Sequence, residues 1–263
     1  MTATVANYQE GQNQFFNQGL FEVSATAKHR LGTIRRLDDG RKYVYCGNTA
    51  AALAAGITIS KAQAPQLCTV AAADAAINLA GVKTVTYTLS GTPTKNLYQD
   101  GFLVVTAGDG LGEMYKIRGN TADDDPASGR CTFYLYDALQ TLQVTATTTV
   151  SAWENPYSNL LITPATANGA ATTQETVMGV TTRIIVASQY FWAQTWGLGN
   201  LMLDIDAAAG AEANEMSIIL GTTTGRGLVL VTTAMPGMQI LGYTLESADL
   251  TDATGNLVNL LIS

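Results

Sequence analysis

Apolar and polar residues alternate over short runs along most of the chain from Leu31 onward. In the run RCTFYLYDAL (residues 130–139), Cys131, Phe133 and Leu135 are separated by threonine and tyrosine. A two-residue period is typical of a strand with one buried face. Other runs rich in Val, Thr, Ile and aromatic residues are KTVTYTLSG (83–91), GFLVVTAGDG (101–110), TRIIVASQYFWAQTWG (182–197), RGLVLVTTA (226–234), QILGYTLES (239–247) and NLVNLLIS (256–263).

Turn and helix signals complete the expected secondary structure. Asp39 and Gly40 lie between two strand-like runs in residues 31–47, and an Asp-Gly pair is typical of a tight hairpin. The alanine-rich run VAAADAAINLAG (70–81) predicts a helix that ends at Gly81, and TAAALAAG (49–56) predicts a single helical turn. The fold class expected is therefore mainly β, a sandwich or barrel-like arrangement with one or two short helices.

Three segments are predicted along the chain. Residues 1–30 are rich in glutamine and asparagine and contain Phe15, Phe16 and Phe21, which favours an extended N-terminal arm that becomes ordered on a neighbouring subunit. A first edge strand is the alternative. Residues 31–155 and 156–263 form two β-rich parts, divided near the small-residue and proline-containing stretch at 154–177, unless that stretch is a long loop within one domain.

Composition favours an assembled protein and argues against nucleic-acid binding. Hydrophobic residues make up 47% of the 263 residues and charged residues only 13%, so the surface cannot be a dense charged shell. The net charge of −7 opposes affinity for phosphate. Residues 1–42 are nevertheless locally basic, with a net charge of +2, and this indicates an acidic partner, most plausibly a protein. The cationic residues are Lys28, Arg30, Arg35, Arg36, Arg41 and Lys42.

Targeting and redox signals are weak. The first residues show no signal-peptide pattern, and no run reaches the ~18 apolar residues of a membrane span. Cys46, Cys68 and Cys131 are odd in number and far apart, so we expect three free thiols in a protein made in a reducing cytoplasm.

No motif predicts catalysis, a cofactor or a metal site. His29 is the single histidine and has no nucleophile motif near it. The run GDGLGE (108–113) lacks the lysine and the serine or threonine of a phosphate loop, so its glycines are read as shaping a hairpin. The aspartates at 123–125 lack calcium-loop spacing, and Asp204 with Asp206 is a weak candidate for a glycosidase carboxylate pair.

The order of several stretches resembles structural proteins of tailed bacteriophages. They are GRKYVYCGNTAAALAAGITIS (40–60), DGFLVVTAGDGLGEMYKIRGN (100–120), FYLYDALQT (133–141), NPYSNLLI (155–162), YFWAQTWG (190–197) and GMQILGYTLESADLTDATGNLVNLLIS (237–263). The ending is similar to that of capsid decoration, or cement, proteins. It contains Ile240, Gly242, Tyr243, Gly255, Leu257, Val258, Leu260 and Ile262.

The resemblance implies a non-enzymatic virion protein on the outside of the capsid, made in the host cytoplasm, with the major capsid protein as partner. We also expect self-association as a dimer or trimer, and neither nucleic acid nor membrane as a partner. Alternatives are a tail-tube or tail-fibre component, or a host-attachment module that binds carbohydrate on Trp192 and Trp196. The candidate interface residues are Phe15, Phe16, Phe21, Lys28, Arg30, Arg35, Arg36, Arg41, Tyr190, Trp192 and Trp196.

The aromatic cluster QYFWAQTWGLGNL (189–201) supplies three of these candidates. In strand phase, Tyr190, Trp192 and Gln194 share one face, while Phe191 and the residues in phase with it share the other. At least one aromatic row is therefore expected in a core or an interface, and the sequence leaves both interpretations open.

Overall fold

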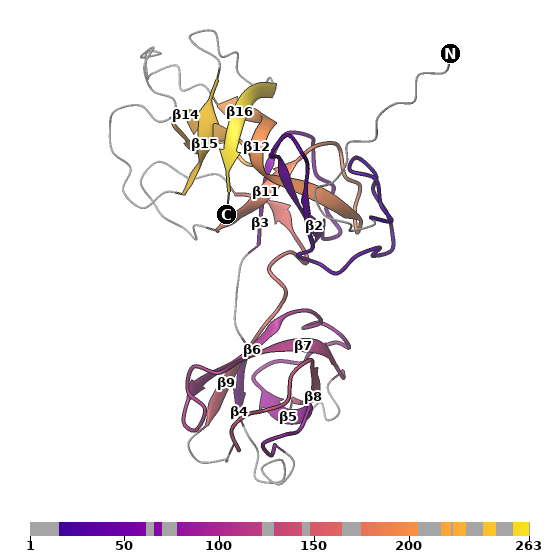
Figure 1. The fold of residues 1–263 in the computed structure, drawn as a ribbon, viewed down its shortest axis with the longest axis vertical. Coiled ribbons are helices and arrows are strands. Elements are labelled where there is room, and N and C mark those ends of the chain that lie inside the picture. Colours follow the sequence, from indigo (N-terminus) through magenta and orange to yellow (C-terminus); the bar gives the residue numbers. More distant parts are fainter. Residues whose placement is uncertain are drawn as a thin grey trace. The chain divides into compact units, whose positions relative to one another are not determined.

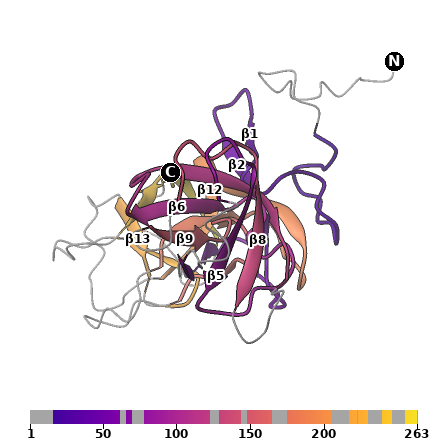
Figure 2. The ribbon, with the colours of Figure 1, turned by 90° about the horizontal axis from the view of Figure 1, so that it is seen from below.

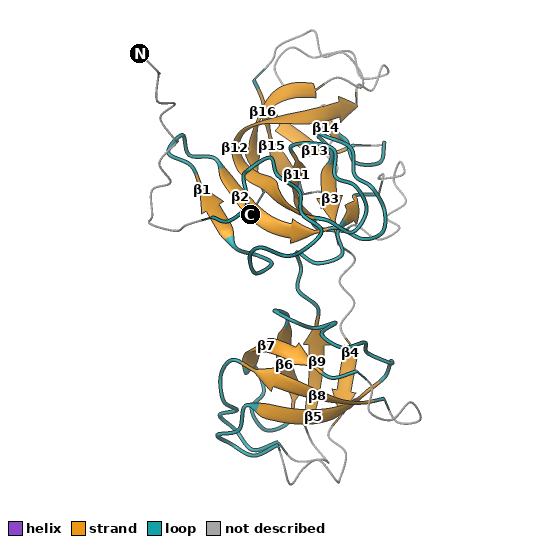
Figure 3. Cartoon of the chain, turned by 90° about the vertical axis from the view of Figure 1, so that its right-hand side faces the viewer, coloured by secondary structure: helices purple, strands orange, loops and turns teal. Residues whose placement is uncertain are grey.

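The computed structural model describes residues 16–61, 66–69, 78–122, 129–143, 148–164, 175–204, 217–221, 223–229, 239–245 and 255–262. Regular secondary structure in these ranges consists of strands, with no helix among them (Figure 3). The mainly β fold class is confirmed. The chain divides into two compact units, which are described separately: residues 63–156 form one, and residues 1–62 together with 157–263 form the other (Figure 1).

The unit of residues 63–156, here called the barrel unit, is a closed barrel of antiparallel strands in the order β4-β5-β8-β7-β6-β9 (Figure 2). The strands are β4 (Gln66–Thr69), β5 (Thr84–Leu89), β6 (Phe102–Ala107), β7 (Met114–Asn120), β8 (Arg130–Leu135) and β9 (Thr149–Trp153). As their alternation predicts, Cys131, Phe133 and Leu135 of β8 point into the barrel and are buried. Side chains from all six strands fill this core, so the barrel has a hydrophobic core of its own.

The other unit, here called the sheet unit, contains one large twisted sheet. Its strands are β1 (Ile34–Arg36), β2 (Lys42–Gly47), β3 (Thr58–Ser60), β10 (Leu161–Ile162), β11 (Val177–Thr181), β12 (Tyr190–Asp204), β13 (Ser217–Leu220), β14 (Gly227–Val229), β15 (Ile240–Thr244) and β16 (Gly255–Leu261). The hairpin predicted at Asp39 and Gly40 is confirmed, since β1 pairs with β2 and Gly40 has the positive φ of 87° that such a turn needs.

The fifteen-residue strand β12 belongs to two rings of strands. In the first ring, pairing runs from β12 through β14, β13, β15 and β16 and returns to β12. The second ring runs through β2, β12, β11, β3 and β10, and a bridge between Asn48 and Leu160 joins its ends. Each ring surrounds its own hydrophobic cluster, so β12 connects two small barrel-like cores.

A bulge after Gln194 separates the two halves of β12. The pairing with β2 shifts register between Gln194 and Trp196, and Gly197 has a φ of 81°. The buried Gln194 amide donates from Nε2 to the carbonyl oxygens of Trp196, Gly197 and Leu198 at 3.2, 3.4 and 2.7 Å. These hydrogen bonds hold the bulge, and they explain why an amide is tolerated in the interior.

The predicted division of the chain differs from the observed one. Residues 31–62, expected to belong with the barrel residues, instead supply β1, β2 and β3 to the sheet unit. The cause is the long pairing of β2 with β12, which joins residues about 150 positions apart and which strand periodicity cannot reveal. The barrel unit is therefore an insertion into the sheet unit.

The helix predictions also need correction where the structure describes them. Residues 49–56 contain bends, a turn and a bridge from Leu53 to Ile185 in place of a helical turn. Leu53 is buried there, so burial of one side chain in the sheet unit decides the local structure. Of the predicted helix at 70–81, residues 70–77 lie outside the described residues, and Gly81 forms a turn with φ 89°.

The expected N-terminal arm is packed on its own chain over the residues that the structure describes. Gln18 is fully buried, donates from Nε2 to the carbonyls of Glu22 and Tyr190 at 2.9 Å, and accepts from the Tyr45 hydroxyl at 2.6 Å. Ser24 bridges to Tyr190. Residues 16–30 are thus part of the sheet unit, which corrects the arm prediction for that range, while residues 1–15, including Phe15, lie outside the described residues.

We predict that residues 63–156 fold when produced alone. The first and last strands, β4 and β9, are antiparallel neighbours, so the chain enters and leaves the barrel side by side. In the sheet unit Ser60 pairs with Leu161, so the two chain ends left when the barrel unit is removed also lie side by side. The isolated barrel should show a β-type circular dichroism spectrum and one cooperative urea transition. A spectrum of unfolded chain would contradict the prediction.

Candidate functional site

The outer side of the first ring carries an exposed apolar surface, here called the apolar face. It lies on neighbouring strands β12, β16 and β15, whose inward side chains fill the ring core. Its large side chains are 37–52% exposed. They are Trp196 and Leu198 of β12, Leu257 of β16, and Ile240, Tyr243 and Leu245 of β15 and the residue after it.

Strand register gathers these side chains into one surface. Leu198 and Tyr243 flank Asn259 from opposite sides, and the Leu245 amide donates to the Leu257 carbonyl at 3.1 Å. The outward positions of the three strands carry no Asp, Glu, Lys or Arg. At the edge, the Lys42 ammonium lies 4.5 Å above the Trp196 ring. Exposed apolar surface of this kind is a candidate site of protein interaction.

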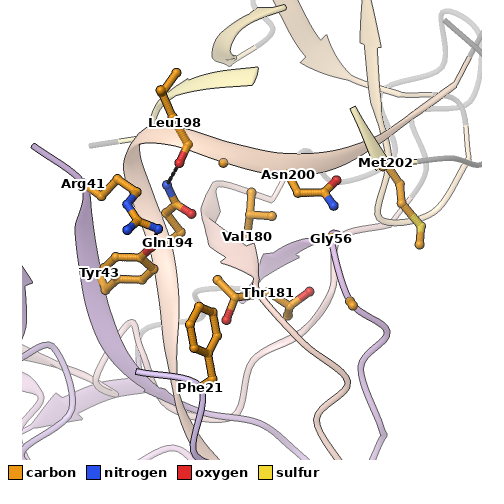
Figure 4. A pocket seen from close by; sticks show the side chains of 14 residues that line it. Phe21, Arg41, Tyr43, Gly56, Val180, Thr181, Gln194, Leu198, Asn200 and Met202 are labelled. Atoms are coloured by element: carbon orange, nitrogen blue, oxygen red, sulfur yellow. Dashed lines mark hydrogen bonds between the residues drawn. The ribbon is translucent and has the colours of Figure 1, made fainter. Parts of the chain in front are cut away.

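A pocket of about 260 Å³ lies where the apolar face meets the second ring (Figure 4). Leu198 belongs to both the face and the pocket, and the Phe21 side chain points toward the pocket from the N-terminal segment. The other lining residues are Arg41, Tyr43, Ala55, Gly56, Val180, Thr181, Thr182, Gln194, Gly199, Asn200, Met202 and Gly255.

The polar groups at the floor of the pocket already have partners within the chain. The Gln194 amide donates to the bulge carbonyls, and the Thr181 hydroxyl donates to the Ala54 carbonyl at 2.7 Å. The Tyr43 hydroxyl accepts from Arg41 at 3.1 Å, and Arg41 also pairs with Asp39 at 2.7 Å. These groups are therefore less available to a polar guest, and Leu198 and Met202 add apolar surface to the lining.

The predicted basic interface residues fall into two groups. Lys28, Arg30 and Arg36 are exposed. Arg35 packs inward, with its guanidinium carbon 4.8 Å from the Phe16 ring centre, and Arg41 is engaged by Asp39 and Tyr43 as described above. The exposed group can interact with a partner through charge, whereas Arg35 and Arg41 contribute first to the fold.

The aromatic candidates also divide. Trp192 is 1% exposed, packs edge-on against Phe16 and Tyr45, and donates from Nε1 to the Gln18 carbonyl at 3.3 Å. Trp192 is therefore a core residue rather than an interface residue, which settles the choice that the sequence left open. Tyr190, half-buried, stacks on Tyr45, while Trp196 stays on the surface. The two tryptophans cannot form a joint sugar platform, because only one of them reaches solvent.

Among the described residues, the catalytic candidates are not brought together. Asp204 is 6% exposed, accepts from the Thr223 amide at 2.5 Å, and pairs with Arg226 at 3.2 Å, which gives it a structural role. Asp206 and the aspartates at 123–125 lie outside the described residues. His29 packs against the rings of Phe16, Tyr45 and Trp192, and burial together with the charge of Arg35 lowers its pKa. Within the described ranges, no three His, Cys, Asp or Glu side chains are grouped as metal ligands.

The loop GDGLGE (108–113) joins β6 to β7, which confirms the hairpin interpretation. Its glycines at 108, 110 and 112 all have positive φ, the conformation that a tight loop requires. The Leu111 side chain projects from it and is 68% exposed. A phosphate-binding role has no support from this geometry, because the loop connects two strands rather than a strand to a helix.

All three cysteines are buried and none of them forms a disulfide, as the sequence predicts. Burial raises the pKa of Cys68 to about 12 and raises the pKa of Cys46 as well. At pH 8 the folded protein should therefore react with a thiol reagent only very slowly, and all three thiols should react once urea unfolds it. Fast labelling without urea would contradict this.

The same pKa shifts predict a pH dependence of stability. The folded protein keeps the Cys68 proton above pH ~8.5, where the unfolded chain has lost it. Its contribution to stability is thus complete below pH ~8.5 and is lost progressively as pH rises toward 12. Urea midpoints measured between pH 7 and 10 should fall at the alkaline end, and by less in a Cys68→Ala variant.

No helix in the described ranges combines the length and the apolar character that crossing a membrane requires. Comparisons with protein-family models, with curated proteins and with solved structures find no match. The chain's own residues therefore carry the functional argument.

Sequence reasoning missed the apolar face, although the outward residues Tyr243, Leu245 and Leu257 lie within the ending that carried the resemblance. The signal that could have revealed the face is a strand with apolar residues at both its inward and its outward positions.

Proposed function

We propose that this protein is a structural component of a tailed-bacteriophage virion that binds the outside of the capsid lattice and stabilises it. The observation that carries the proposal is the apolar face, because three adjacent strands present large apolar side chains and no charge to the outside. The major capsid protein is the partner in this proposal, and no substrate is turned over. The ordered resemblance to decoration proteins and the low content of charged residues, 13%, support the same function.

The mechanism follows from the surface chemistry. Burial of the apolar face against a capsomer supplies most of the binding free energy. Full burial of a large exposed apolar side chain contributes about 1.5–3 kcal/mol, and these side chains, which are 37–52% exposed, contribute a part of that each. The exposed cations Lys28, Arg30 and Arg36 add attraction to an acidic shell, which salt screens over roughly 8 Å. Contacts repeated over the lattice then convert a modest interface into firm attachment.

The experiment adds purified protein to shells that lack it and measures occupancy and the rupture temperature of the particles. Shells should bind the protein and rupture at a higher temperature, and raised salt should weaken binding without abolishing it. The variant Leu257→Asp places a charge in the apolar face and should lower the affinity at least about tenfold.

Ile184→Asp is the matched control. Ile184 is 66% exposed and lies outside the apolar face. The variant therefore adds the same charge away from the proposed docking surface, and it should bind like the unaltered protein. If the unaltered protein stays in solution, or binds without changing the rupture temperature, the cementing function is wrong and a tail or attachment role replaces it. If Leu257→Asp binds normally, the apolar face is not the docking surface.

A further inference from the structure

We propose that copies of this chain bind one another, with Leu111 of one copy inserted into the pocket of the next. This contact concerns the free protein and goes beyond shell binding. Its two parts are the β6–β7 loop of the barrel unit and the pocket of the sheet unit described above.

The β6–β7 loop is built as a rigid projection. The Leu111, Gly112 and Glu113 amides donate to the carbonyls of Gly108, Val105 and Gly110 at 3.2, 3.0 and 2.9 Å. The Glu113 carboxylate accepts from the hydroxyls of Tyr115 and Thr141 and so fixes the base of the loop.

This rigid loop presents an apolar tip. Of the large apolar side chains in the described residues, Leu111 is the most exposed, and Met114 beside it is 63% exposed. A loop whose backbone is already hydrogen-bonded before binding loses little backbone conformational entropy on docking.

The pocket matches this projection in size and in polarity. A cavity of about 150 Å³ lined by apolar side chains accommodates benzene, and this pocket has a volume of about 260 Å³. It can therefore receive the Leu111 side chain with space for part of Met114. Leu198 and Met202 supply apolar contacts, and the Thr181 hydroxyl and the Gln194 amide are hydrogen-bonded within the chain.

Charge around the two surfaces is complementary. Asp109 is exposed beside Leu111. The exposed Arg183 guanidinium donates to the carbonyl of Phe21, which lines the pocket, whereas Arg41 is already paired with Asp39. A docked loop that places the Asp109 carboxylate near Arg183 is favoured over the reverse orientation.

The contact is heterologous, because the projection and the pocket are different surfaces. A copy that donates its loop keeps its own pocket free for a third copy. Association would then grow with concentration, either to a closed ring or to a chain of copies. A lone symmetric dimer would not result from this contact.

The experiment measures association by sedimentation velocity over a range of concentrations. Leu111→Asp removes the projection, and Ala55→Trp fills the pocket from a turn without removing a core side chain. Each variant alone should remain monomeric, with the dissociation constant raised at least about thirtyfold, the effect expected of a central interface residue. Leu67→Asp is the control, since Leu67 is a 51% exposed leucine on β4 of the barrel unit, away from the β6–β7 loop, and its variant should associate normally.

An equal mixture of the two variants gives the decisive result. The intact loop of Ala55→Trp fits the intact pocket of Leu111→Asp, so the mixture should form dimers and nothing larger. A monomeric wild type, oligomers that persist in either variant, or a mixture that stays monomeric would each overturn the proposal. Since no shells are present, these outcomes are separate from the test of capsid binding.

Discussion

Replacing Trp192 with alanine should destabilise the sheet unit by about 3–5 kcal/mol, the usual cost of deleting a large buried aromatic side chain. Trp192 touches Phe16 and Tyr45, lies 5.7 Å from the Arg35 guanidinium, and holds the Gln18 carbonyl. The change would remove a shared contact between the N-terminal segment and the sheet. Hydrogen exchange measured by mass spectrometry should show faster exchange in residues 16–30 and in β2, with the barrel unit unchanged.

Trp196→Ala is the matched control. Trp196 lies on the same strand but is 37% exposed, so its loss should lower the free energy of unfolding by clearly less than the loss of the fully buried Trp192. Equal effects of the two substitutions would show that Trp192 does not occupy the core described here. An unaltered exchange rate in residues 16–30 of the Trp192 variant would show that this segment does not depend on the aromatic cluster.

Replacing Gly101 with alanine should destabilise the barrel unit by at least about 3 kcal/mol. A Cβ at Gly101 would lie 2.2 Å from the Trp153 carbonyl oxygen and 2.9 Å from that of Tyr98. The Gly101 amide donates to the Tyr98 carbonyl and its own carbonyl accepts from Ile117, both at 2.9 Å, so the backbone cannot move aside without losing hydrogen bonds. Urea unfolding followed by circular dichroism measures the loss.

Gly112→Ala separates this clash from the general effect of adding a methyl group. Gly112 has a φ of 90° but no atom within 4 Å of a Cβ built on it. Only conformational strain opposes the change, at a cost of about 1 kcal/mol. If Gly112→Ala proves as harmful as Gly101→Ala, close packing against β9 is not what demands glycine at 101.

Strand periodicity predicted the local structure where one side of a strand is buried. The alternation in β8 and the turn at Gly40 were sufficient, because both depend on residues that are neighbours in sequence. The N-terminal segment was harder. A polar composition suggests a solvated arm, yet Gln18 is buried because hydrogen bonds from distant strands satisfy its amide. Composition does not reveal partners of that kind.

The candidate surface shows a similar limit. Simple strand phase places Trp192 and Trp196 on the same side of β12, but one is core and the other surface. The bulge after Gln194 interrupts the strand pairing between them, and the N-terminal segment covers Trp192 through Phe16 and Gln18. Neither feature follows from periodicity. The pocket depends further on Phe21 and Val180, which only the folded sheet brings together.

The insertion of the barrel unit determines how the chain would carry mechanical load. A pull between Phe16 and Ile262 acts on the sheet unit, because both residues belong to it. Ser60 pairs with Leu161, and a 2.7 Å hydrogen bond from Lys61 to Ser158 reinforces this pairing. Tension can reach the barrel only after these two contacts break. In a force-extension measurement the sheet unit should therefore unfold first, and the barrel unit should bear no force until the contacts at Ser60 and Lys61 have broken.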